Sequence, residues 1–79
     1  MKKEKIINYI NELLKENNFN RPIGLDDSLF LSGLLDSLNM TCLIVFLETE
    51  FNVDFSVVGF DVEEIDTINL ISNLAGIQQ

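Results

Sequence analysis

Residues 34–51 decide the fold of this chain, and they read LLDSLNMTCLIVFLETEF. Within them, the six apolar residues from Cys42 to Leu47 would suit a buried strand, but neither alternation nor a hairpin partner accompanies them. The stretch from Ser37 to Phe51 is also long for a strand, which favours a helix. The sequence therefore predicts a helix from Ser37 to Phe51.

Two faces of this predicted helix follow from its 3.6-residue period. One apolar stripe should face the core, with its last member one turn on: Leu43, Phe46, Leu47 and Phe51. Another face should be partly exposed and suggests a surface on which partner proteins dock: Met40, Thr41, Ile44 and Glu48. The alternative, that Met40 and Ile44 also belong to the core of so short a chain, stays open.

Ser37 stands where an apolar loop hands over to this helix. Turn formers and the isolated breaker Gly33 precede it, so its hydroxyl should be accessible. Ser37 can act as the N-cap or as a first-turn residue, and a phosphate esterified to it would be favoured by the positive end of the helix dipole. Position alone also allows Ser37 to be only a helix cap.

Helical patterns flank this segment on both sides. A first amphipathic helix is predicted from the recurrence of Ile6, Ile7, Ile10, Leu13 and Leu14, and it should stop near Asn17-Asn18. A long loop should then run to about Asp36. The loop offers several apolar side chains that could fix it to the core: Ile23, Leu25, Leu29, Phe30, Leu31, Leu34 and Leu35.

The C-terminal part predicts shorter elements. Asn52 to Phe60 reads as a loop, and Asp61 to Glu64 as one short helical turn. Asp66-Thr67 then provides a capping residue for a last short helix ending near Gly76. That helix is indicated by five apolar residues: Ile68, Leu70, Ile71, Leu74 and Ile77.

Composition removes most catalytic chemistry. The chain of 79 residues, which we expect to form one domain, has no His and a single cysteine, Cys42. Cys42 has no basic neighbour to activate it and is expected to be a buried apolar residue. The acids of residues 61–66 lack the ligand spacing of a calcium loop, so we expect no metal site.

The charge is distributed unevenly. All five basic residues lie in the first 21 positions, whereas residues 22–79 contain ten acids and neither Lys nor Arg, and the net charge is −8. Nucleic acid and anionic membranes are therefore poor partners, and basic protein surfaces are good ones. The alternative is that acidity only keeps a small domain soluble.

No targeting or membrane segment is expected. Residues 6–12 lack the continuous apolar stretch of a signal peptide, so the protein should stay in the cytoplasm. Residues 28–47 have the length of a membrane span, but Asp36 near their centre argues against membrane insertion.

The chain resembles the acyl carrier protein family, which includes peptidyl and D-alanyl carriers. The resemblance lies in the motif Leu34-Leu35-Asp36-Ser37-Leu38, in the helix that ends in residues 47–51 and in the order of the helices. The resemblance covers nearly the whole chain. It implies an all-α four-helix bundle of three main helices and one short helix, with a long loop between the first two. It also implies that Ser37, flanked by Asp36 and Leu38, receives 4′-phosphopantetheine from coenzyme A.

The same resemblance implies how the chain works. A phosphopantetheinyl transferase would modify it, a ligase would load an acyl or aminoacyl group as a thioester, and a downstream acyltransferase or synthase would take the group away. The chain itself would be a monomer without catalytic activity. A rival from another class is an acidic helical adaptor that binds its partner non-covalently.

Departures from the common pattern bear on the pathway. Fatty-acid carriers usually read Gly-Ala-Asp-Ser-Leu, then an acid, with a second acid three residues on. Here the segment from Gly33 to Ser37 is one residue longer, and Asn39 and Cys42 occupy the acidic positions. These differences favour a stand-alone D-alanyl carrier, or a carrier of a specialised pathway, over the fatty-acid type.

Overall fold

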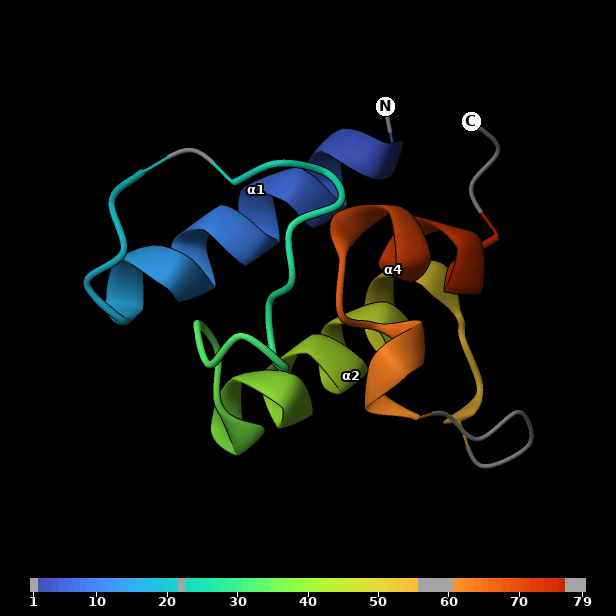
Figure 1. Ribbon diagram of the computed structural model, residues 1–79. Helices are drawn as coiled ribbons and strands as arrows, with labels where there is room; N and C mark the ends of the chain where they lie inside the picture. The colour runs from blue at the N-terminus through green and yellow to red at the C-terminus, as the bar shows by residue number, and fades with distance from the viewer. Residues whose placement is uncertain (1, 22, 56–60, 77–79) are drawn as a thin grey trace.

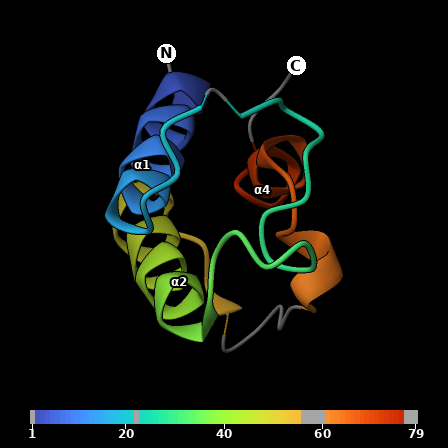
Figure 2. The same cartoon turned by 60° about the vertical axis from the view of Figure 1, so that its left-hand side comes forward.

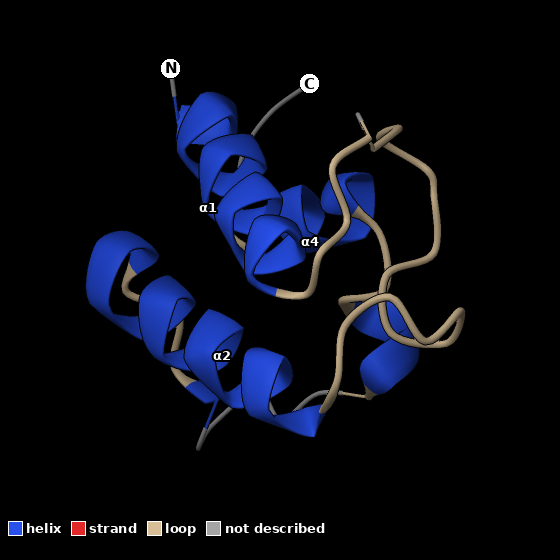
Figure 3. Ribbon diagram, turned by 90° about the vertical axis from the view of Figure 1, so that its left-hand side faces the viewer, coloured by secondary structure: helices blue, strands red, loops and turns tan. Residues whose placement is uncertain are grey.

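The computed structural model describes residues 2–21, 23–55 and 61–76, and all regular structure in these ranges is helical (Figure 3). The elements are α1 (Lys2–Glu16), α2 (Ser37–Phe51), the 3₁₀ helix η1 (Val62–Glu64) and α4 (Ile68–Leu74). The all-helical class predicted from the sequence is confirmed for these residues. None of the helices described has the length and apolar content needed to cross a membrane.

Helix α1 buries the stripe that its sequence period predicts. Its fully or almost fully buried side chains are Ile6, Ile10, Leu13 and Leu14. The helix ends where two asparagines follow it, because Asn18 takes the left-handed conformation with φ of 64° and the N–H of Phe19 returns to the Leu14 carbonyl. The predicted end near Asn17-Asn18 is confirmed.

Helix α2 has the predicted bounds. Leu43 and Leu47 are completely buried, while Phe46 and Phe51 are partly buried against the same core. Phe46 stacks on Tyr9 of α1, with ring centroids 4.1 Å apart. The helix ends at Asn52, which again adopts the left-handed conformation, with φ of 56°.

The segment between α1 and α2 contains no regular helix in its described residues, 17–21 and 23–35. Leu29 and Leu35 are buried and fix it to the core. Three other candidate anchors, Ile23, Phe30 and Leu34, pack partly buried against the core. Leu25 and Leu31 do not anchor the segment, since they are 41% and 64% exposed. Polar bonds hold this stretch instead, and Gly33, with φ of 87°, supplies the left-handed residue of its turn.

The C-terminal part agrees with the caps expected for it. The predicted loop is present over Asn52 to Asp54, but Phe55 is helical and residues 56–60 and Ile77 lie outside the described residues. Thr67 caps α4 by accepting a hydrogen bond from the Leu70 N–H at 3.1 Å. Gly76 follows the helix with φ of 78°, as its role in ending the helix requires.

The helices surround one core (Figures 1 and 2). Helices α1 and α2 lie together on one side, and α4 and η1 on the other, with α1 packed against α4. The α1–α2 connection runs beside the start of α4, where the Asn69 N–H donates to the Leu25 carbonyl at 3.1 Å. This path brings the connection to the N-terminal end of α2, and so to Ser37.

Candidate functional site

Ser37 is the first residue of α2 and is exposed. Its hydroxyl makes no hydrogen bond within the part of the chain that the structure describes. Asp36 is the N-cap, and its Oδ1 accepts the Asn39 N–H at 2.9 Å. The idea that Ser37 is itself the cap is therefore wrong, because the carboxylate before it already occupies that role, and the serine hydroxyl is left uncommitted.

Asn39 completes the start of α2. Its Oδ1 accepts the backbone N–H of Asp36 at 3.1 Å, which makes a reciprocal capping box. The same oxygen accepts from Asn17 Nδ2 at 3.0 Å, so the first turn of α2 is tied to the end of α1. Asn39 is only 7% exposed. Sequence reasoning missed this role, although an Asp followed three residues later by an amide was a usable signal.

The four predicted docking residues lie at different depths. Thr41 and Glu48 are exposed, whereas Met40 and Ile44 are half-buried, and Met40 packs against the core. The sequence left open whether Met40 is a docking residue or a core residue, and each description is partly correct. Its side chain contributes to the core and still reaches the surface.

Two more exposed apolar side chains share α2 with Ser37. Leu38 is 72% exposed and Val45 is 54% exposed. Their spacing of seven residues places them on the same face of the helix, with Thr41 between them. Sequence reasoning named Leu38 beside the attachment serine but missed Val45. Together with Glu48, these residues form a surface beginning next to Ser37 that combines two apolar side chains with a threonine and a carboxylate. We call it the α2 face (Leu38, Thr41, Val45 and Glu48).

Charge on α2 is sparse. The helix contains no basic residue, and Glu50 pairs with Lys5 of α1 at 2.7 Å. Glu48 makes no ion pair within the described part of the chain, so it remains available to a partner. The α2 face therefore offers one carboxylate in an apolar setting, which suits a partner surface of matching character.

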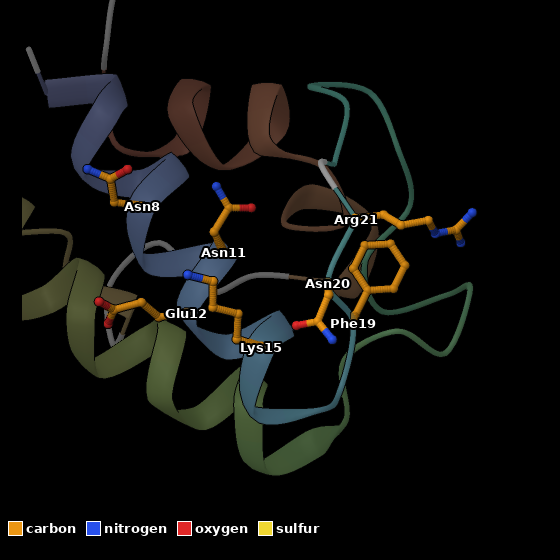
Figure 4. A pocket seen from close by; sticks show the side chains of 7 residues that line it. All are labelled: Asn8, Asn11, Glu12, Lys15, Phe19, Asn20 and Arg21. Atoms are coloured by element: carbon orange, nitrogen blue, oxygen red, sulfur yellow. The ribbon is translucent and has the colours of Figure 1, made fainter.

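Two surface hollows lie near α1 in the described part of the chain, and neither is lined by Ser37. One, of about 500 Å³, lies along α1 and the residues after it (Figure 4). Its lining is mostly polar: Asn8, Asn11, Glu12, Lys15, Phe19, Asn20 and Arg21. At the edge of this hollow, the Arg21 guanidinium lies over the Phe19 ring, 5.1 Å from the ring centre. A second, of about 540 Å³, shares Phe19 and Arg21 and reaches Leu34. Ser37 faces solvent rather than either hollow.

An exposed, uncommitted hydroxyl at the head of a helix fits a covalently attached phosphodiester. In agreement with this geometry, the family model described as "Phosphopantetheine attachment site" matches residues 4–75. The chain belongs to this family of carrier proteins. It holds an acyl or aminoacyl group as a thioester on a covalently bound 4′-phosphopantetheine arm, and the adaptor alternative is set aside.

Similar proteins narrow the comparison within this family of carriers. The D-alanyl carrier protein of Streptococcus suis (strain 05ZYH33) is 41% identical over 69 residues, which cover 87% of this chain and 84% of that protein. The D-alanyl carrier protein of Leuconostoc citreum (strain KM20) is 33% identical over 69 residues, covering 87% and 85%. No solved structure matches the chain at a significant level.

Proposed function

We propose that Ser37 is the attachment site and that the cargo of this carrier is D-alanine. The observation that supports the site is the free, exposed hydroxyl of Ser37, which its neighbour Asp36 relieves of any capping role. The names of the similar proteins support the cargo. The longer segment from Gly33 to Ser37, and the uncharged Asn39 and Cys42, also favour this type over a fatty-acid carrier.

The attachment chemistry asks little of this chain. Ser37 Oγ forms a new P–O bond to the phosphopantetheinyl phosphorus of coenzyme A and gives up its proton, while adenosine 3′,5′-bisphosphate leaves with the electrons of the broken bond. The positive end of α2 favours the resulting phosphodiester at this position. When bound, the arm supplies a terminal thiol that carries the cargo as a thioester, whose carbonyl stays reactive toward nucleophiles.

Several further properties belong to the same proposal. Residues 1–79 form a single carrier domain, a four-helix bundle of three main helices and one short helix with a long loop after α1. The chain is a monomer that performs no catalytic step itself. It works in the cytoplasm, where coenzyme A and ATP are available. Its partners are a phosphopantetheinyl transferase, a D-alanine-activating ligase and a downstream acyltransferase.

The α2 face, together with Met40 and Ile44, is the proposed docking surface. The exposed Leu38 and Val45 lie on the helix that begins at Ser37, so they offer apolar area that a partner can cover during each encounter. A small apolar surface also permits brief binding, which a carrier that visits several enzymes needs. Asp36 and Leu38 flank the arm, so partner enzymes would contact them together with it.

Docking can be tested by replacing exposed apolar side chains on α2 and, as a control, on α4. Leu38→Ser and Val45→Ser should raise the KM for cargo transfer, whereas Leu70→Ser, at an exposed leucine of α4, should not. Met40→Ala and Ile44→Ala should also slow transfer, with melting temperature recorded because Met40 touches the core. Unchanged transfer in all four α2 variants would rule out this surface.

The cargo is tested by loading. The phosphopantetheinylated protein is incubated with ATP, radiolabelled D-alanine and a D-alanine-activating ligase, and protein-bound label is then treated with hydroxylamine, which cleaves thioesters. We expect label that hydroxylamine releases and that Ser37→Ala never acquires. Label from a fatty acid with its own ligase, but none from D-alanine, would overturn the cargo assignment while leaving the carrier function intact.

A further inference from the structure

Asp66 lies just before α4, and its carboxylate is almost completely buried, with 7% of the residue exposed. Its Oδ1 accepts two backbone N–H groups of the α1–α2 connection, from Phe30 at 2.7 Å and from Leu31 at 2.9 Å. Its Oδ2 accepts the Ser28 hydroxyl at 2.5 Å. One side chain thus binds three donors from a segment more than 30 residues away in sequence.

Backbone bonds extend this attachment toward Ser37. The Leu29 N–H donates to the Asp66 carbonyl at 2.7 Å, and the Leu35 N–H donates to the Leu29 carbonyl at 2.8 Å. Leu35 directly precedes Asp36, the N-cap of α2. Residues 28–35, which we call the Asp66-bound loop, therefore connect the start of α4 to the start of α2. In Figure 1 the teal stretch just before this segment runs beside α4, and the green segment that follows leads into α2.

Ser28 and Ser32 close the loop on itself. The Ser28 hydroxyl that donates to Asp66 also accepts the Ser32 N–H at 3.0 Å, and the Ser32 hydroxyl donates to the Ser28 carbonyl at 2.6 Å. The Ser28 hydroxyl thus connects the Asp66 carboxylate to the Ser32 N–H, while the Ser32 hydroxyl closes the turn by a separate bond.

Apolar packing alone does not fix this loop. Leu29 and Leu35 are buried, and Phe30 and Leu34 pack partly buried against the same core. Leu31, which also donates its N–H to Asp66, has its side chain 64% exposed. A buried carboxylate is tolerated only when donors surround it, and the loop N–H groups equally need an acceptor. Removing the carboxylate would leave the N–H groups of Phe30 and Leu31 without their acceptor and would loosen the loop at Leu31, whose side chain has no place in the core.

We propose that Asp66 is a positioning residue for the modification of Ser37: it holds the Asp66-bound loop so that the transferase meets Leu31, Asp36 and Ser37 in one fixed arrangement. The inference rests on the proposal that Ser37 is the attachment site. Asp66 touches neither the hydroxyl nor coenzyme A. It acts by keeping most molecules in the conformation that the transferase binds.

A population effect of this kind has a kinetic signature. When only a fraction of the carrier has the loop in place, apparent binding weakens by that fraction, while the rate at saturation is retained. The expected effect is on KM for the carrier, with kcat nearly unchanged. We expect Asp66→Ala to raise KM roughly tenfold. Asp66→Asn, whose carbonyl can still accept from Phe30 and Leu31, should raise it less.

The test separates positioning from general stability with a matched control. Leu14→Ala removes a buried α1 side chain from the core that also contains Leu29 and Leu35, but it leaves all three hydrogen bonds of the Asp66 carboxylate in place. Transferase kinetics with coenzyme A are measured at a temperature where calorimetry shows every variant folded. Hydrogen exchange of the Phe30, Leu31 and Leu35 amides is measured on the unmodified proteins. Asp66→Ala should show faster exchange at these three amides and a higher KM for the carrier. Leu14→Ala should keep both the amide protection and the KM near those of the wild type.

Two results would overturn the proposal. One is a folded Asp66→Ala variant with wild-type KM and wild-type amide protection. The other is an equal rise in KM for Leu14→Ala. Should Asp66→Ala not fold, Ser28→Ala removes one of the three donors and must show the same two effects in weaker form, or the proposal is wrong. Failure of the wild-type chain to be modified at Ser37 would instead contradict the proposed function, because the exchange measurement does not depend on modification.

Discussion

Asn17 at the end of α1 donates from Nδ2 to Oδ1 of the buried Asn39 at 3.0 Å, and this bond joins two helices next to Ser37. The same Asn17 nitrogen also donates to the Leu13 carbonyl at 2.9 Å. The start of α2 is thus held from two directions, by α1 through Asn17 and by α4 through the Asp66-bound loop.

The role of Asn39 can be tested by two substitutions. Asn39→Leu removes the acceptor of both bonds and should lower the free energy of unfolding by about 1–3 kcal/mol, since two donors lose their partner. Asn39→Asp keeps an acceptor oxygen near the positive end of α2 and should stay within about 1 kcal/mol of the wild type. Urea unfolding followed by circular dichroism measures both. Equal stability of the two variants would show that the acceptor is unimportant.

The Asp66 carboxylate predicts loss of stability in acid. Burial tends to raise its pKa, but the hydrogen bonds that the carboxylate accepts from the Ser28 hydroxyl and from the N–H groups of Leu31 and Phe30 outweigh burial and lower the pKa below the ordinary 3.8. A lowered pKa stabilises the fold above the unfolded-state value of about 3.9, and this contribution is lost as pH falls through the folded-state value. The melting temperature of the wild type should therefore decrease when the pH is lowered below about 4.

The matching variant isolates this residue from the other acids. Asp66→Asn should melt lower than the wild type at neutral pH, and the gap should narrow as the pH falls through the acidic range. Calorimetric scans of both proteins at a series of pH values provide the comparison. A gap that stays constant with pH would mean that ionised Asp66 does not stabilise the fold.

Local pattern explains why the helices could be predicted. The period of Ile6, Ile10, Leu13 and Leu14 marks the buried side of α1, and the cap at Thr67 lies three residues from the N–H group that it binds. In residues 42–47 every side chain is apolar, so the pattern does not reveal which side faces water. That is why the exposure of Val45 was missed.

Hydrogen bonds between residues far apart in the chain could not be predicted from the sequence. Asn17 and Asn39 are 22 positions apart, and Ser28 and Asp66 are 38 apart. From the sequence, Asp66 is only one of the acids of residues 61–66 or part of the capping pair before the last helix. Its burial depends on the path of the α1–α2 connection past α4, and periodicity contains no information about that path.

Ser72 of α4 is an unfavourable residue at its position. It is completely buried, and its hydroxyl has no hydrogen-bond partner in the structure as described. Ser72→Ala removes an unsatisfied polar group and improves helix propensity, so we expect a gain of about 1 kcal/mol in the free energy of unfolding. Ser37→Ala, at an exposed serine of α2, should change stability by less than about 0.5 kcal/mol. A destabilised Ser72→Ala protein would disprove this reading of the core.

The acidic part of the chain predicts a response to salt. Ten acids in residues 22–79 face no Lys or Arg from the same stretch, so their repulsion should be screened by added ions. The Lys5–Glu50 pair is exposed, and its own weakening in salt should matter little. We expect sodium chloride, and divalent cations at lower concentration, to raise the melting temperature. Glu63→Gln should reduce that rise, and a melting temperature independent of salt would contradict the prediction.

The measurement that tests the central claim most directly is the site of phosphopantetheine attachment. The purified chain is incubated with coenzyme A and a broad-specificity phosphopantetheinyl transferase, weighed intact, and fragmented to locate the modification. We predict the gain of one phosphopantetheinyl group on Ser37, its absence in Ser37→Ala, and its retention in the loop control Ser32→Ala. No gain in mass, or a gain that survives Ser37→Ala, would contradict the account.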